Sequence, residues 1–304
     1  MSKRFVAIIV ARQGSKRLPG KALLKINNKP IISLIIERLK NISIIDQICV
    51  ATSNKDIDKP IIDLAKKEKV LFYSGSPEDV LDRLYKSAYH SKAEIIYEVG
   101  GDCPFVDEKT IIKGYNLLQE YGYDFVHNFP PSTYPDGLDC PIMTFKCLEK
   151  MHEKAILSSN RMHPFSYIFT YPEYFKVGNF DYFQVANDIR LTLDYKEDFT
   201  LISKIFNSLY SKNINFSLDD IVGFLRKNPK LISINEKYIE PLSPEPYWNT
   251  LAFINDLHND LFMLTKKIKD LNNRGLRKLN DKNYDEVIRI TKLLKKRAEF
   301  SSGL

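Results

Sequence analysis

The first 128 residues alternate short apolar runs with amphipathic segments, and this alternation limits the possible folds more than any other feature of the sequence. Phe5–Val10 (FVAIIV) is continuously apolar and rich in β-branched residues, which is typical of a strand buried on both faces. The same reasoning predicts strands at 47–52, 70–73, 94–99 and 125–128, separated by helices at 31–39, 57–68, 79–88 and 110–121. Strands that alternate with helices form a mostly parallel sheet flanked by helices on both faces. We therefore predict an α/β fold.

The pattern is looser after residue 128. We expect a proline-rich loop, a strand at 140–144, a helix at 146–154, a short strand at 191–193 and a helix at 196–209. Three prolines between residues 241 and 246 (PLSPEP) indicate a linker. Two amphipathic helices are expected beyond it, at 249–271 and 284–299. The predicted organisation is a main domain over 1–240 and a linker with a basic helical appendage over 241–304.

The net charge of +7 is located in the tail, because residues 264–304 carry the whole excess and residues 1–263 are neutral overall. The charge therefore says little about the ligand of the main domain. A hydrophobic content of 44% excludes wholesale disorder, and no apolar run approaches the ~18 residues of a membrane span. The four cysteines form no C-x-x-C pair, so we expect free thiols and a cytoplasmic protein.

A basic loop follows the first predicted strand, at the position where α/β sheets commonly bind ligands. It spans residues 11–21 (ARQGSKRLPGK) and holds four cationic side chains, those of Arg12, Lys16, Arg17 and Lys21. Backbone N–H groups together with arginine and lysine suit a polyphosphate. The loop matches neither the P-loop nor the G-x-G-x-x-G pattern. A solvated basic loop is the alternative, and the position after the strand favours the binding site.

Two carboxylates follow other strand ends. Asp102 comes after Gly100 and Gly101 at the end of the fourth strand, and Asp194 follows the short strand expected at 191–193. Carboxylate oxygens suit Mg²⁺, which usually takes one or two of them plus substrate phosphates. We predict a metal ligand at Asp102, while Asp194 is either a second ligand or a helix N-cap. Asp107 is expected to be the N-cap of the next helix.

Weaker features lie further along the chain. The turn at 134–139 (YPDGLD) contains Asp136 and Asp139, and Arg161 and His163 lie in a polar stretch before a proline. A lone histidine is more often structural than functional. Local sequence shows neither a His/Cys metal spacing nor a Ser–His–Asp arrangement.

These stretches resemble one family in the right order. The basic loop, VLDRL at 80–84, GDCPFVD at 101–107, YPDGLD at 134–139, NRMHP at 160–164 and RLTLDYKED at 190–198 are similar to the SpsF-type cytidylyltransferases that activate sugars. They resemble CMP-Kdo and CMP-sialic acid synthetases more distantly. The resemblance covers about residues 4–210.

The resemblance implies a GT-A-like nucleotide-binding fold and transfer of a nucleotidyl group from CTP to a sugar or sugar acid, with release of pyrophosphate. Such an activated sugar serves surface polysaccharide or glycan biosynthesis. The implied catalytic residues are Lys16, Arg17, Lys21 and Asp102, and the implied ligands of a Mg²⁺ cofactor are Asp102 and Asp194. The nucleotide-binding residues are then Ala11, Arg12, Gly14, Ser15, Lys16, Arg17, Lys21, Thr52, Gly101 and Asp102. The acceptor-binding residues are Asp136, Asp139, Arg161 and His163.

Two other functions remain open from the sequence. A nucleotide-sugar-dependent glycosyltransferase on the same kind of fold would release a nucleotide instead of pyrophosphate. A nucleic-acid-binding protein could use the basic tail, but the tail's charges alternate with apolar helical positions, which favours a helical cap or a homodimer contact. Met162 stands where many relatives carry glutamate, so the sequence leaves the sugar acceptor open.

Overall fold

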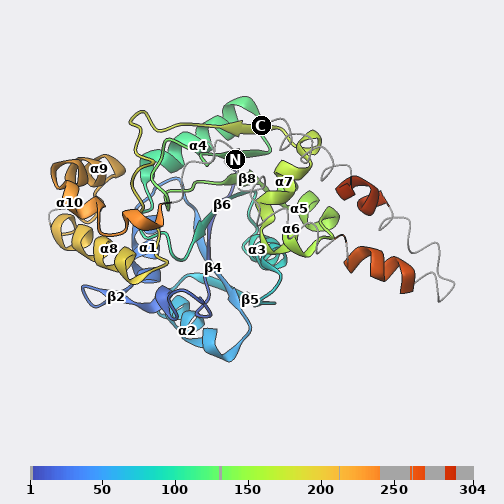
Figure 1. Cartoon of the computed structure of the whole chain (residues 1–304), viewed down its shortest axis with the longest axis horizontal. Coiled ribbons are helices and arrows are strands. Elements are labelled where there is room, and N and C mark those ends of the chain that lie inside the picture. The colour runs from blue at the N-terminus through green and yellow to red at the C-terminus, as the bar shows by residue number, and fades with distance from the viewer. Residues whose placement is uncertain are drawn as a thin grey trace.

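A seven-stranded sheet forms the centre of the computed structural model, which describes residues 3–129, 132–211, 213–239, 261, 263–270 and 285–291 (Figure 1). The strand order is β5-β4-β1-β6-β8-β7-β9. The strands are β1 Phe5–Val10, β4 Gln47–Ser53, β5 Leu71–Gly75, β6 Ile95–Gly100, β7 Phe125–His127, β8 Ile142–Thr144 and β9 Val177–Asn179. Strand β8 runs antiparallel to β6 and β7, and the other pairs are parallel. The predicted mostly parallel sheet is confirmed. A separate antiparallel pair joins β2 (Lys25–Ile26) to β3 (Lys29–Pro30).

Helices cover both faces of this sheet. They are α1 Ile31–Lys40, α2 Lys59–Lys67, α3 Val80–His90, α4 Glu108–Tyr121, α5 Phe145–Lys154, α6 Ser158–Met162, α7 Pro164–Thr170, α8 Lys196–Leu209, α9 Leu218–Lys227 and α10 Pro229–Ile232. Apolar side chains of α1, α2, α4, α8 and α9 belong to one core cluster, and those of α3, α5 and α7 to another. Figure 1 shows α8–α10 and α3 with α5–α7 on opposite sides of the sheet. Short 3₁₀ turns lie at Lys21–Leu23, Asp56–Asp58, Pro172–Tyr174 and Glu236–Tyr238.

Strand β1 shows why its sequence is continuously apolar. Phe5, Ala7 and Ile9 face the first cluster, whereas Val6 and Ile8 face the second. All five side chains are fully buried, since β1 lies between β4 and β6 and helices cover both faces. The prediction that Phe5–Val10 is a strand buried on both faces is therefore confirmed.

The strand expected at 191–193 does not form, and this prediction was wrong. Residues 191–193 instead join two loops: Leu191 N–H donates to the Asp136 carbonyl (2.7 Å) and Leu193 N–H donates to the Asp102 carbonyl (2.9 Å). A short apolar run can be buried between loops without a neighbouring strand. The following helix, α8, begins as expected at Lys196, but its N-cap is Tyr195 and not Asp194.

The described parts of the tail, 263–270 and 285–291, are helical, as the sequence predicts for those positions. The expected linker at 241–246 and the remaining parts of both predicted helices lie outside the described residues. Leu264 and Ile290 pack with Leu157, just before α6. The Tyr171 hydroxyl, at the end of α7, donates a hydrogen bond to the Glu286 carboxylate. The described tail segments therefore contact the α6–α7 region, beyond which they lie in Figure 1.

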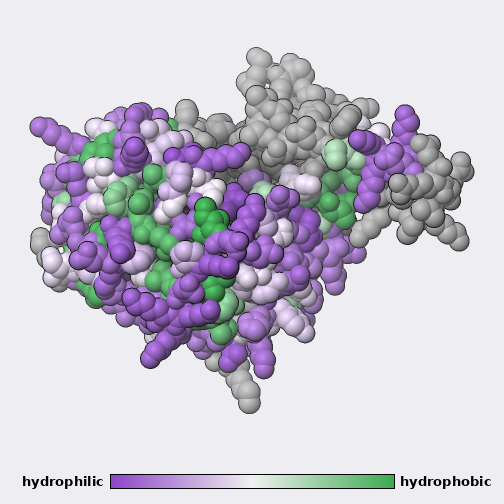
Figure 2. Space-filling model, turned by 90° about the horizontal axis from the view of Figure 1, so that it is seen from below, coloured by the Kyte–Doolittle hydropathy of each residue, from purple (hydrophilic) through white to green (hydrophobic). Residues whose placement is uncertain are grey.

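Hydrophilic side chains dominate the described surface in Figure 2, with hydrophobic ones gathered in limited areas. A search of the described helices finds none with the length and apolar character needed to cross a membrane. The four cysteines are free thiols, as expected: Cys49, Cys140 and Cys147 are buried, and Cys103 is half-buried.

Candidate active site

The basic loop after β1 meets the turn after β6, because these two strands are adjacent and parallel, with Val10 paired to Gly100. Gly101 N–H donates to the Val10 carbonyl at 2.9 Å. A Cβ atom on Gly101 would lie 2.5 Å from the Ala11 Cβ, so only glycine allows this approach. Gly101 therefore allows the segments that follow β1 and β6 to lie against each other.

The basic loop is fixed from beneath by one buried carboxylate. Asp58 accepts a hydrogen bond from Gln13 N–H at 2.6 Å and another from the Ser53 hydroxyl. Gly20 N–H donates to the Gln13 carbonyl at 3.1 Å, and Gly20 has φ = 75°, a value that favours glycine. The loop thus closes on itself around Gln13, while Arg12, Lys16 and Arg17 stay exposed.

Lys21 joins the two predicted metal carboxylates. Its Nζ lies 2.6 Å from Asp102 Oδ2 and 2.8 Å from Asp194 Oδ1, and Arg17 contacts the same Asp194 oxygen at 2.7 Å. Burial lowers the pKa of Lys21, but Asp102 and Asp194 outweigh that effect, so the net pKa is raised. Burial likewise raises the pKa of Asp194, yet Lys21, Arg17 and Arg190 bring it below its usual value. Both groups are therefore charged at neutral pH.

Arg190 organises the carboxylates beside this pair. Its guanidinium contacts Asp136 (2.5 Å), Asp194 (2.9 Å) and Asp198 (3.1 Å), and its side chain is only 7% exposed. Asp198 is completely buried, and it also accepts the N–H groups of Asp194 and Tyr195. The planar, multi-donor guanidinium suits this role better than an ammonium group would. Arg190 therefore positions Asp194 at the mouth of the site.

A cleft of about 630 Å³ lies over these groups. Most of the residues predicted from the sequence line it, and they are Ala11, Arg12, Gly14, Ser15, Lys16, Arg17, Lys21, Gly101, Asp102, His163 and Asp194. Thr52 does not, because it is fully buried within β4. The sequence thus brings the predicted phosphate-binding and metal-binding groups to one cleft.

A second pocket, of about 660 Å³, adjoins the cleft and shares Arg17, Met162, His163 and Asp194 with it. Predicted acceptor residues Asp136 and Asp139 line this pocket. Arg161 does not line either cavity: its Nε donates to Asp79 Oδ2 at 2.6 Å, and its NH1 donates to the carbonyls of His152 and Ala155. These contacts tie α6 to the N-terminus of α3, so Arg161 is placed as a structural residue.

Arg83 is a cleft residue that the reasoning from sequence did not assign. It is 1% exposed and lines the cleft from α3, yet its Nε and NH1 have no hydrogen-bond partner among the described residues. Burial and the nearby Arg12 lower its pKa. Buried guanidinium nitrogens without acceptors are costly unless a ligand supplies them. The only signal in the sequence was its place in VLDRL, one of the stretches that carried the resemblance.

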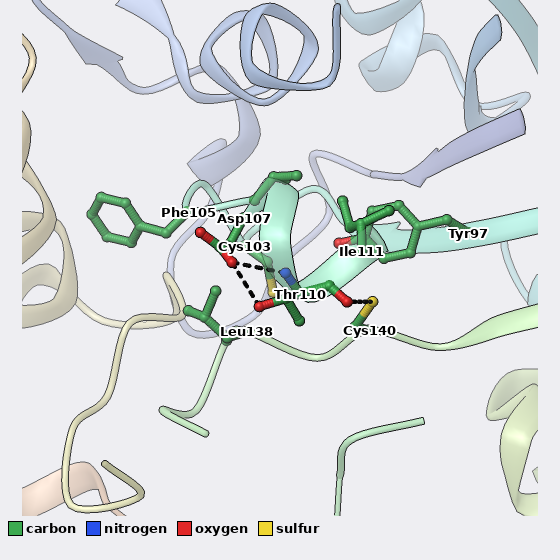
Figure 3. Close-up of a pocket in the computed structure, with 10 residues that line it drawn as sticks. Tyr97, Cys103, Phe105, Asp107, Thr110, Ile111, Leu138 and Cys140 are labelled. Carbon is green, nitrogen blue, oxygen red and sulfur yellow. Dashed lines mark hydrogen bonds between the residues drawn. The ribbon is translucent and has the colours of Figure 1, made fainter. Parts of the chain in front are cut away.

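A further hollow behind the end of β6, drawn in Figure 3, is too small for a ligand at about 10 Å³. Its dashed contacts show Asp107 accepting hydrogen bonds from the Thr110 N–H (2.9 Å) and hydroxyl (2.7 Å). Asp107 is thus the N-cap of α4, which confirms that prediction.

Residues 6–221 match the family model described as Cytidylyltransferase. The chain belongs to the cytidylyltransferase family. This family member is 34% identical over 234 residues to an uncharacterized protein of Methanocaldococcus jannaschii, covering 76% of this chain and 94% of that protein. It is 26% identical to the spore coat polysaccharide biosynthesis protein SpsF of Bacillus subtilis, covering 73% of this chain and 94% of SpsF.

Solved structures agree with this assignment. A cytidylyltransferase from Leptospira borgpetersenii is 30% identical, with a TM-score of 0.72, and the match covers 76% of this chain and 97% of that one. A CMP-2-keto-3-deoxy-manno-octonic acid synthetase solved with CTP is 15% identical, has a TM-score of 0.51 and covers 67% of this chain and 99% of that one, which shows a shared fold. The predicted fold class is confirmed, and the chain is a nucleotidyltransferase of this family.

Proposed function

We propose that this cytidylyltransferase transfers a cytidylyl group from CTP to a sugar acceptor. In this step an acceptor oxygen attacks the α-phosphorus, a new P–O bond forms and the bond to the bridging oxygen of the β-phosphate breaks. Pyrophosphate leaves with that oxygen, and the acceptor hydroxyl releases its proton. The observation that carries the proposal is the meeting of four cationic side chains and two carboxylates around one cleft that opens into a second pocket.

The exposed cations of the loop are the groups we assign to the triphosphate. Arg12 and Lys16 have no ion-pair partner within the described part of the chain, and both line the cleft. Arg17 and Lys21 stand beside them and stabilise the departing pyrophosphate. Phosphoryl chemistry of this kind needs positioning and neutralisation of charge more than covalent help. The unpaired N–H groups of Arg83 offer further donors to the nucleotide.

Asp102 and Asp194 fit the predicted Mg²⁺. Their oxygens lie around the single Lys21 Nζ, so the two carboxylates already surround one cationic centre. Two carboxylates suit Mg²⁺ when phosphate oxygens and water complete its shell. When bound, Mg²⁺ would neutralise charge on the phosphates and orient them. Lys21 then has three donors to turn toward the phosphates.

The proposal is tested by pyrophosphate release. The protein is mixed with Mg²⁺ and each of the four common nucleoside triphosphates, with a panel of neutral, amino, acidic and phosphorylated sugars. We expect release with CTP and one class of acceptor, and release slower by about 10²-fold or more with Asp102→Asn at matched concentration. An activated sugar of this kind feeds polysaccharide or glycan assembly. Release of a nucleotide from a nucleotide sugar, with no pyrophosphate from CTP, would instead support the glycosyltransferase alternative.

A further inference from the structure

Glu98 is an acidic residue in β6, a central strand of the sheet whose other side chains are apolar or aromatic. Strand β6 is bonded to β1 on one side and β8 on the other, and Ile95, Ile96, Tyr97 and Val99 are buried as such a strand requires. Glu98 lies on the same side of the strand as Ile96 and lines the second pocket instead of contributing to the core. A carboxyl group in the middle of a central strand is unusual enough to indicate a function.

Asp139 lines the same pocket, and hydrogen bonds fix the backbone of the residues before and after it. The side-chain amide of buried Asn128 donates to the Leu138 carbonyl at 2.8 Å and accepts from Cys140 N–H at 2.7 Å. These bonds bracket Asp139, whose side chain is exposed into the pocket. Glu98 lies close by, because its N–H donates to the Pro141 carbonyl at 3.2 Å. The two carboxyl groups are thus fixed on rigid elements at one wall of the pocket.

The cations around this pocket already have carboxylate partners. Among the described lining residues only Arg17 and Arg190 carry a permanent positive charge. Arg190 is shared by three aspartates, and Arg17 pairs with Asp194. The side-chain carboxyl groups of Glu98 and Asp139 have no hydrogen bond or ion pair with the described part of the chain. Within that part, these two groups therefore lack a cationic partner.

The pKa values of the two carboxyl groups agree with their lack of a cationic partner. Burial, and then the charges of Asp102 and Asp139, raise the pKa of Glu98 to about 8. Asp139 is exposed to the pocket, but the protein around it displaces most of its water, and this desolvation, followed by the charges of Asp136 and Asp102, raises its pKa to about 7. Burial and the neighbouring carboxylates thus disfavour the ionised form of each group. A ligand that brings a positive charge would relieve both.

We propose that the acceptor is an amino sugar whose ammonium group binds at Glu98 and Asp139. The inference rests on the proposed function and names its acceptor class. A sugar acid or sugar phosphate would add a negative charge to a pocket whose described cationic side chains, Arg17 and Arg190, already pair with carboxylates. A neutral sugar would bring no positive charge to favour the ionised forms of Glu98 and Asp139. Phe129, Pro135 and Phe165 provide apolar walls for the sugar ring, as is usual in such sites.

The test compares three hexoses that share a ring and differ in charge: glucosamine, glucose and glucuronate. Their binding to the full chain is measured by saturation-transfer NMR titration at pH 7, with CTP absent. We expect glucosamine to bind about 10-fold more tightly than glucose, the effect of one charge-assisted contact. Glucuronate should bind most weakly. The double variant Glu98→Gln/Asp139→Asn should lose the preference for glucosamine, and the surface variant Asp63→Asn should retain it.

Three results would overturn the inference: equal binding of glucosamine and glucose, a preference that persists in the folded double variant, or no glucosamine binding up to ~50 mM. Thermal unfolding of each variant shows whether it is folded. Failure of the inference and of the proposed function can be told apart. Pyrophosphate release from CTP to an acidic or neutral sugar would refute the amino-sugar acceptor and keep the cytidylyl transfer. A charge-dependent preference for glucosamine without any pyrophosphate release would support amino-sugar binding at this pocket and refute the cytidylyl transfer.

Discussion

Replacing Gly101 with alanine should separate the two segments that build the cleft. The new Cβ would lie 2.5 Å from the Ala11 Cβ and 3.2 Å from its Cα, against the 3.4–4 Å of ordinary contact. The loop after β1 must then move by about 1 Å, and overpacking of this kind costs about 1–3 kcal/mol. For a domain of this size, we expect a fall of about 2–4 °C in melting temperature per kcal/mol.

The same displacement moves the cationic loop away from Asp102, so activity should fall further than stability. A misplacement of about 1 Å in a positioned site costs about 10²-fold in rate. Calorimetry and pyrophosphate release from CTP measure the two effects on the same preparations. Gly223→Ala, in α9 with nothing within 4 Å of its Cβ, is the matched control: it should keep the rate and should keep or raise the melting temperature, because alanine favours the helix over glycine. A Gly101→Ala protein with wild-type stability and rate would refute the reasoning from close approach.

Three further outcomes follow from the site. Asp102→Asn should lower kcat by about 10²-fold or more with little change in melting temperature, measured by pyrophosphate release; a near wild-type rate would remove Asp102 from the metal site. Arg190→Ala should cost about 3–5 kcal/mol in urea unfolding because it leaves buried carboxylates unpaired, whereas Arg226→Ala, whose partner is exposed, should cost under about 1 kcal/mol. Glu98→Gln should change the pH dependence of stability.

The sign of that pH dependence follows from the raised pKa of Glu98. Between its unfolded value near 4.5 and its folded value of about 8, the folded protein binds the extra proton. Wild-type stability therefore falls as pH rises through this window, by at most about 1.4 kcal/mol per pH unit from this group. Glu98→Gln lacks the carboxyl group, so its stability relative to wild type should rise from pH 5 to pH 8. A constant difference across that range would contradict the assignment.

The sequence predicts the sheet well because β1, β4 and β6 are largely buried on both faces, and strands in that environment are mostly apolar. The prediction of a strand at 191–193 fails. These residues, Leu-Thr-Leu, are buried between loops and have no neighbouring strand. Local composition is the same in the two cases. The difference lies in the partners of the backbone, which are the carbonyls of Asp102 and Asp136 and are distant in sequence.

The site is predictable where residues follow strand ends in sequence, as the basic loop and Asp102 do. It is not predictable where a side chain arrives from the side of a helix or from within a strand. Arg83 lies inside an ordinary helical pattern, and Glu98 occupies one position in an apolar strand. Thr52 shows the opposite error: it is the last residue of the predicted strand, but it lies inside β4 and is fully buried. Position at a strand end indicates the sheet edge, and only the packing shows which side chains face the cleft.

The role of Lys21 links the structure without nucleotide to the proposed reaction. Asp102 and Asp194 would repel each other at the cleft, and Lys21 holds them together by contacting both. A divalent cation would take over that role, which frees the Lys21 ammonium for the phosphates that arrive with it. In this proposal the Lys21 ammonium group contacts the two carboxylates before the divalent cation binds and contacts the phosphates of the nucleotide afterwards. A neutral side chain at this position would lose both contacts, so its effect should appear in stability without ligand as well as in catalysis.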